Sequence, residues 1–211
     1  MKSEIFGIVC LALFASTLCQ SQFLLAYGLK FGVASARQTW NYSIATSVPA
    51  QTRWGLDIAV SAEALNLPCF SILGELHYVQ KGFLVTLPIS TPAYPEGTGD
   101  YILLKPEVDY ISFPLLAKVR LQGDTYSPFL TLGPRIDVLV RREADGFELV
   151  FDRFSSVDGG VSAGIGLDIR LTTTSRVSAE FRYSPDFTDA HSTHLLAVRN
   201  QSKEFLLGVS F

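Results

Sequence analysis

Five side chains in the first half of this sequence have the types needed for nucleophilic chemistry. His77, Glu75 and Asp57 supply an imidazole and two carboxylates, and Ser61 and Ser71 supply hydroxyl groups. A histidine that contacts both a hydroxyl and a carboxylate can activate the hydroxyl as a nucleophile. A hydrogen-bonded network without catalytic activity uses the same residue types, and we prefer that interpretation. The sequence therefore predicts no catalytic residues.

A second cluster has the residue types of a metal site. His191 and His194 lie close in the sequence to Asp186 and Asp189, and imidazole and carboxylate groups are common metal ligands. The composition of a polar loop explains the same residues more simply. We therefore predict no metal site.

Two glycines superficially resemble part of a phosphate-binding loop. Gly164 and Gly166 alternate with other residues inside an extended segment, and neither a helix nor a lysine follows them. Glycines inside a strand often mark a bend or a close approach of the backbone to its surroundings. We expect close packing or curvature here and predict no cofactor.

Strands are the elements that position these residues, because side-chain character alternates with period two along most of the chain. In the C-terminal segment, for example, Phe205, Leu207, Val209 and Phe211 share one face. The opposite faces carry small or charged residues. The predicted strands are 25–34, 54–64, 70–81, 108–121, 129–141, 157–171, 177–184 and 203–211.

Long connections alternate with short turns between these strands. The long ones are residues 36–53, 84–105, 142–156 and 185–200. Pro114 falls inside the fourth strand. Because proline cannot donate a ladder hydrogen bond, we expect a bulge or a locally open pairing there.

Composition narrows the class of protein further. The 211 residues suffice for one or two domains, and 48% of them are hydrophobic while 18% are charged. The mean hydropathy is +0.27. Beyond the N-terminus, no segment has the roughly 18 uninterrupted apolar residues of a membrane-spanning helix. The net charge of -3 gives no basic excess to favour nucleic acid as a partner.

The N-terminus has the pattern of a secretory signal peptide. Lys2 precedes an apolar run over residues 5–18, and small or polar residues follow it. We predict a signal peptide over residues 1–21 and one β-barrel domain over 22–211. A lipoprotein signal at Cys19 is the alternative, although Leu18 is larger than such a signal prefers.

These features predict an all-β fold, an eight-stranded antiparallel up-and-down transmembrane β-barrel. An even strand number, long outer loops and short inner turns are typical of such barrels. Aromatic residues collect at both ends of the apolar face, where interfacial girdles need them. They are Tyr27, Phe70 and Phe211 at the inner rim, and Trp54, Tyr78 and Tyr183 at the outer rim.

A soluble β-sandwich shows the same alternation, with its apolar face turned inward. The N-terminal segment, the terminal Phe211 and the alternating lengths of the connections favour the membrane barrel. The apolar face would then meet lipid, and the opposite face would line a lumen.

The predicted lumen carries a near balance of charge. Its basic residues are Lys30, Lys118, Arg120, Arg135, Arg141, Arg170 and Arg182, and its acidic residues are Asp57, Glu63, Glu75, Asp137, Asp168, Glu180 and Glu204. Eight strands leave an interior that side chains can fill, and unpaired buried charges are costly. We therefore expect a plug of ion pairs in place of an open pore.

Several segments resemble the PorT-like outer-membrane β-barrel family of Bacteroidota. They are YISFPLLAKVRL (110–121), SPFLTLGPRIDVL (127–139), VDGGVSAGIGLDIRL (157–171), RYSPDFTDA (182–190) and the terminal KEFLLGVSF. The resemblance implies the barrel fold and an outer-membrane location. Some members of that family take part in assembling a protein-secretion apparatus, and the family has no shared catalytic motif.

We expect a structural, interaction or secretion-assembly barrel without catalytic activity. A small-solute transport barrel or a lipid-modifying enzyme is the alternative. The expected partners are outer-membrane lipid and envelope or secretion-system proteins, with the barrel itself monomeric. Arg141, Arg142 and Arg153 flank the third long loop at the outer rim, where they would meet the phosphates of lipopolysaccharide.

Overall fold

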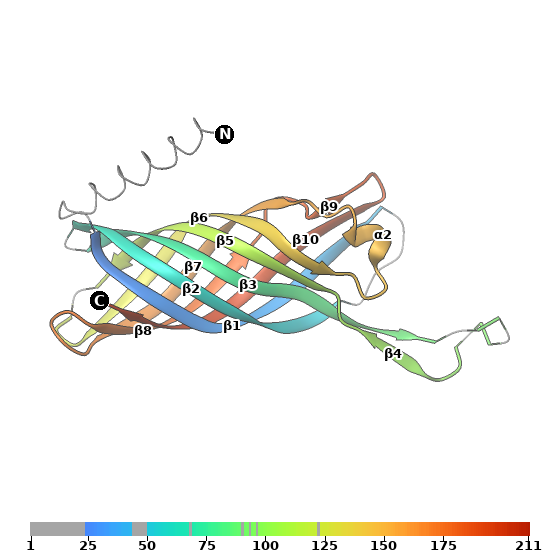
Figure 1. Ribbon diagram of the computed structural model, residues 1–211, viewed down its shortest axis with the longest axis horizontal. Helices are drawn as coiled ribbons and strands as arrows, with labels where there is room; N and C mark the ends of the chain where they lie inside the picture. Colours follow the sequence, from blue (N-terminus) through green and yellow to red (C-terminus); the bar gives the residue numbers. More distant parts are fainter. Residues whose placement is uncertain are drawn as a thin grey trace, which may run out of the picture.

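The computed structural model describes residues 24–43, 50–67, 69–89, 91–92, 94–95, 97–121 and 123–211. Eight antiparallel strands form a closed ring in the order β1-β2-β3-β5-β6-β7-β8-β10, and β10 pairs with β1 (Figure 1). This confirms the predicted fold class and strand number. The predicted signal peptide, residues 1–21, lies outside the described residues.

The ring strands are β1 (Leu24–Tyr42), β2 (Gln51–Leu67), β3 (Phe70–Pro88), β5 (Glu107–Arg120), β6 (Tyr126–Glu143), β7 (Val157–Arg170), β8 (Arg176–Pro185) and β10 (Leu196–Ser210). Three short elements accompany them: β4 (Tyr101–Leu104), β9 (His191–Ser192) and the helix α2 (Glu148–Phe151). The short connections lie at the end where β1 starts and β10 ends, and the long ones lie at the opposite end (Figure 1). Among the described residues, no helix is long and apolar enough to cross a membrane.

The strands extend further toward the outer end than the sequence predicts. Much of the segments 36–53, 84–105 and 185–200, predicted as loops, continues as strand in β1, β3 and β10 or forms β4 and β9. The strands remain hydrogen-bonded to one another where their outward side chains become polar. The alternation of apolar and polar residues, on which the prediction rests, therefore ends before the strands do.

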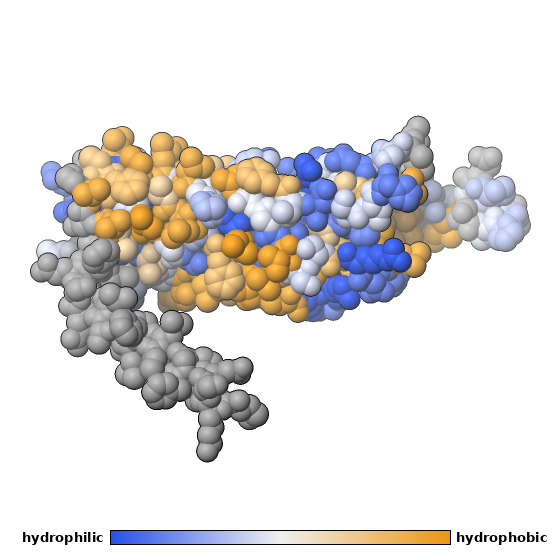
Figure 2. Space-filling view, turned by 90° about the horizontal axis from the view of Figure 1, so that it is seen from above, coloured by the Kyte–Doolittle hydropathy of each residue, from blue (hydrophilic) through white to orange (hydrophobic). Residues whose placement is uncertain are grey.

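The apolar side chains of the ring point outward in the part of the barrel nearest the short turns. Phe31 is 62% exposed and Leu132 is 59% exposed, while Lys30 and Arg135 on the opposite face are buried. Figure 2 shows apolar side chains gathered over this part of the wall and hydrophilic ones over the outer part. We call this apolar zone the lipid-facing band.

The alternation inverts above the band. On β1, Arg37 and Thr39 point outward, whereas Gln38 and Trp40 are buried inside. Phe83 on β3 is also fully buried at this level. Water surrounds the wall here, so the hydrophobic effect drives apolar groups into the interior.

Four of the six predicted girdle aromatics are exposed on the wall, whereas Phe70 and Tyr78 are half-buried. Tyr27 and Phe211 lie 6.1 Å apart between ring centroids at the inner rim. Trp54 is 68% exposed and Tyr183 is 41% exposed toward the outer rim. Such rings favour the headgroup level of a bilayer.

Pro114 is accommodated as expected. The β3–β5 ladder has no pair between Gly74↔Leu115 and His77↔Ser112, so the pairing opens beside the proline. Because β3 and β5 do not pair at this point, the ladder between them loses no hydrogen bond to the N–H that proline lacks.

A charge placed in the lipid-facing band should destabilise the barrel. We expect Leu132→Arg to lower the free energy of unfolding by about 2–4 kcal/mol, because arginine must be desolvated near the bilayer midplane. Urea titration in lipid vesicles, followed by tryptophan fluorescence, measures this. Thr39→Arg, on the outward face above the band, is the control and should change stability by less than about 0.5 kcal/mol. Equal losses in both variants would contradict the placement of the band.

Candidate functional site: the charged lumen and its aromatic cap

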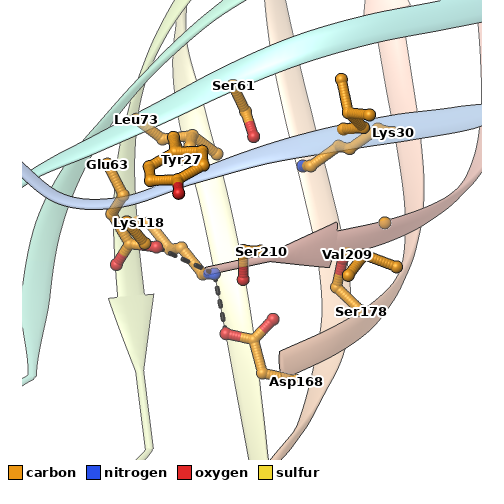
Figure 3. A pocket seen from close by; sticks show the side chains of 13 residues that line it. Tyr27, Lys30, Ser61, Glu63, Leu73, Lys118, Asp168, Ser178, Val209 and Ser210 are labelled. Atoms are coloured by element: carbon orange, nitrogen blue, oxygen red, sulfur yellow. Dashed lines mark hydrogen bonds and ion pairs between the residues drawn. The ribbon is translucent and has the colours of Figure 1, made fainter. Parts of the chain in front are cut away.

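The inner end of the lumen holds a cluster of charges around Lys118. Its Nζ lies 2.8 Å from an oxygen of Asp168 and 3.6 Å from an oxygen of Glu63. Arg120 contacts the same two carboxylates at 3.2 and 2.6 Å. Figure 3 shows the Lys118 amine between the two carboxylates. The Lys118 ammonium also sits 4.2 Å from the centroid of the Phe129 ring, a cation–π contact.

The glycines of β7 make room for this cluster and the next one. A Cβ on Gly166 would overlap the ring of Phe129, and a Cβ on Gly164 would crowd Thr131 and Glu180. The expected role of both glycines in close packing is confirmed.

The centre of the lumen is held by the fully buried guanidinium of Arg182. It contacts Glu75 at 2.6 Å and Glu180 at 2.8 Å. Lys30 reaches the same two carboxylates at 2.7 and 2.6 Å. Two cations and two anions from three strands, β1, β3 and β8, therefore neutralise one another across the ring.

His77 belongs to this central network. Its Nδ1 lies 2.7 Å from Asp57 and its Nε2 lies 2.9 Å from Glu75. Ser71 donates its hydroxyl to Glu63 instead, and Ser61 lines a separate cavity near Lys30. With both ring nitrogens engaged by carboxylates, His77 has no free nitrogen to accept a proton from a hydroxyl. The expected hydrogen-bonded network is present.

A third cluster lies toward the outer end. Lys81 contacts Asp137 at 2.6 Å, and Arg135 contacts both Asp137, at 3.1 Å, and Asp186. The hydroxyl of Tyr110 donates to Asp158 at 3.1 Å. Ion pairs thus fill the lumen at three successive levels.

The predicted balance of charge needs correction. Asp109, Asp158 and Asp186 are buried in addition to the acidic residues expected, and Lys81 is buried in addition to the basic ones. Arg141 and Arg170, which the sequence places in the lumen, are exposed. Buried carboxylates therefore outnumber buried bases among the described residues.

An aromatic cap closes the outer mouth above these charges. Phe147 and Phe151, from the α2 segment, pack on Phe83 of β3 with ring centroids 5.4 and 6.5 Å apart. Trp40 packs on Phe83 at 5.4 Å, and Phe154 stacks on Phe151 at 4.4 Å. Phe151 is fully buried. The α2 segment therefore covers the lumen as a small apolar core.

The histidines and acids near the C-terminus are held apart by other contacts. Asp186 pairs with Arg135 inside the lumen, and Asp189 pairs with a surface arginine. His191 is buried, while His194 is exposed. In the part of the chain that the structure describes, no three His, Cys, Asp or Glu side chains form a group that could hold a metal ion.

The arginines expected to meet lipopolysaccharide are partly engaged within the chain. Arg141 pairs with Glu143 and lies 3.5 Å from Asp109. Arg142 donates to the carbonyl oxygen of Phe151 at 2.9 Å and so anchors the cap. The sequence does not predict the contact of Arg142 with the cap, because the segment 142–156 carries no strong helix signal.

A scan against models of protein families finds the outer membrane protein beta-barrel domain over residues 20–192. The chain belongs to this outer-membrane β-barrel family. Its location is therefore the outer membrane, and the lipid-facing band is the part of the wall that crosses it. A search of curated proteins finds no match.

A search of solved structures finds similar small outer-membrane proteins. Neisserial surface protein A is 13% identical, covering 88% of this chain and 97% of that one, with a TM-score of 0.48. OprG from Pseudomonas aeruginosa is 11% identical, with coverages of 89% and 95% and a TM-score of 0.49. Outer membrane protein W of E. coli is 13% identical, with coverages of 90% and 98% and a TM-score of 0.48.

Removing the central guanidinium should be costly. Arg182→Gln leaves Glu75 and Glu180 short of positive charge, and we expect it to lower the free energy of unfolding by about 3–5 kcal/mol. Arg141→Gln, at a half-exposed ion pair, should cost about 1 kcal/mol or less. Urea titration in lipid vesicles measures both.

Adding Glu75→Gln to Arg182→Gln supplies the matched test. It removes one of the two stranded carboxylate charges and should recover part of the lost stability. If the double variant were less stable than Arg182→Gln alone, the neutralisation of charge would not be what stabilises this level of the lumen.

Proposed function

We propose that this outer-membrane barrel is a non-catalytic interaction protein that contacts another envelope protein through its outer face. The lumen supports this function, because the described residues leave no continuous route through it. A polar cavity of about 460 Å³ opens at the inner mouth beside Arg120, Asp168 and Arg170. Further inside, the cavities measure about 20 Å³ near Lys30 and about 10 Å³ near His77. Each holds about one water molecule. Solute transport would need a continuous path, and in the described part of the chain ion pairs and the cap fill the lumen beyond that inner mouth.

The observation that carries the proposal is an arm that projects from the outer end. The end of β3 and the strand β4 form a two-stranded hairpin beyond the barrel wall (Figure 1). Tyr101 is 69% exposed and Leu103 is 48% exposed, and both lie opposite residues of β3. Large apolar side chains held in water on a projecting element are typical of a protein-binding surface.

The free edge of the arm indicates how a partner binds. Among the described residues, β4 pairs with β3 alone, so the backbone groups on its other edge are open to a further strand. An extended segment of a partner can add to such an edge, with main-chain hydrogen bonds giving affinity. The apolar side chains of Tyr101 and Leu103 then give specificity. A secretion-assembly role, as in the PorT-like family that the sequence resembles, is compatible with this mode.

The arm should be required for partner capture. We expect Tyr101→Ser/Leu103→Ser to reduce recovery of the partner from cross-linked outer-membrane extracts at least about fivefold, because apolar burial is lost. Quantitative mass spectrometry of the captured proteins measures this. Leu149→Ser removes another exposed apolar side chain, on α2, and should leave recovery unchanged. Equal recovery of the partner by the wild type, Tyr101→Ser/Leu103→Ser and Leu149→Ser would contradict the role of the arm.

The filled lumen leads to a separate prediction about conductance. In planar bilayers the wild-type barrel should show no stable conductance, and deletion of the cap residues 144–154 should not create one, because the ion-pair levels remain below. Stable conductance steps in the wild type would favour the transport alternative. Turnover of phospholipid in a hydrolysis assay would favour the enzymatic one.

A further inference from the structure

The seam between β1 and β10 carries a cluster of positive charge just above the lipid-facing band. Along β10 the outward residues are apolar up to Phe205 and become polar at Lys203. Along β1 the same change occurs between Val33 and Arg37. Arg37 pairs in register with Gln201, and so lies diagonally next to Lys203 across the seam.

The two cations of this seam are free within the described chain. Arg37 and Lys203 are exposed, and neither forms an ion pair or a side-chain hydrogen bond with a described residue. The next outward cation, Arg199, is already paired with Asp189 at 2.5 Å. Arg141 and Arg142, at the mouth, are engaged as well. The seam therefore presents uncompensated positive charge at the outer edge of the band.

A groove connects these charges to the apolar wall. It has a volume of about 470 Å³, and its lining includes Ser35, Arg37, Thr52, Phe181, Tyr183 and Lys203. Phe181 is 48% exposed and Tyr183 is 41% exposed. One end of the groove is thus cationic and hydroxyl-rich, and the other end is aromatic and continuous with the band.

We propose that this seam is a binding site for a phosphorylated glycolipid of the outer leaflet. The phosphate binds Arg37 and Lys203, and the acyl chains lie on Phe181, Phe205 and Val33. Charge-assisted contacts of a guanidinium and an ammonium to phosphate are strong, and the adjoining apolar wall accepts the chains without exposing them to water. Because the groove lies at the edge of the band, the phosphate of such a lipid can meet the cations while its acyl chains lie on the apolar wall.

Charge and position argue against the other occupants of this groove. A second copy of the chain, packed about a two-fold axis, would bring the same cationic patch against itself. A free phosphate ion would use only two exposed, hydrated cations, whose contacts contribute little, and would leave the aromatic part of the groove unused.

Native mass spectrometry of the barrel in neutral detergent micelles, with added diphosphoryl lipid A, tests the site. We expect the wild type to retain lipid A and Arg37→Gln/Lys203→Gln to lose roughly thirtyfold in affinity, since each cation near an anionic lipid contributes a factor of about five. Lys105→Gln/Arg170→Gln removes the same net charge from exposed positions elsewhere and should bind as the wild type does. Retention of the folded, heat-modifiable band on electrophoresis shows that each variant is folded.

Four further outcomes would overturn the assignment. Equal losses in both double variants would mean that net charge alone attracts the lipid. Equal retention of dephosphorylated lipid A, or full competition by millimolar inorganic phosphate, would remove the phosphorylated lipid as the occupant. Lipid-free dimers that dissociate only in Arg37→Gln/Lys203→Gln would assign the seam to a second copy. Loss of partner capture in the arm variant is independent of all these readouts.

Discussion

Neutralisation of charge inside a ring too narrow for bulk water is the constraint on which this structure depends. Eight strands leave an interior that side chains fill, and each charged group in it must find an opposite charge or a hydrogen bond. Arg182 meets this requirement by contacting Glu75 and Glu180, which lie 107 and 2 residues away. The contact with Glu75 joins β8 to β3 on the far side of the ring, so it holds the shape of the ring as well as balancing its charge.

The surroundings of the wall decide which face of a strand is apolar. Within the band, lipid lies outside, and the outward side chains are apolar while the lumen is ionic. Above the band, water lies outside, and the same strands bury Trp40, Phe83 and Val198 in the cap. The molecule thus has a membrane barrel and a small soluble β-barrel end to end on one set of strands. Because the cap closes the outer, soluble β-barrel, partners can reach only its outer surface.

The sequence predicts the ring well and its outer part poorly. Alternation with period two gives eight strands, both girdles and the opening beside Pro114. The extension of β1 to Tyr42 is missed because the alternation inverts there and resembles that of a polar loop. The pairing of Arg135 with Asp186 is missed because the aspartate lies in a segment predicted as a loop. Contacts such as that of Lys30 with Glu180 join residues 150 apart, and no local pattern encodes them.

The seam of the ring joins the first and last strands of the chain. Gly28 pairs with Ser210, and Lys30 pairs with Gly208. Until the final residues are in place, the sheet has two open margins whose amide groups no acyl chain can satisfy. An open sheet is therefore costly in the hydrocarbon, and we expect insertion and closure of the barrel to be coupled. Truncation of the last few residues would accordingly prevent biogenesis of the whole protein, whatever its effect on any single contact.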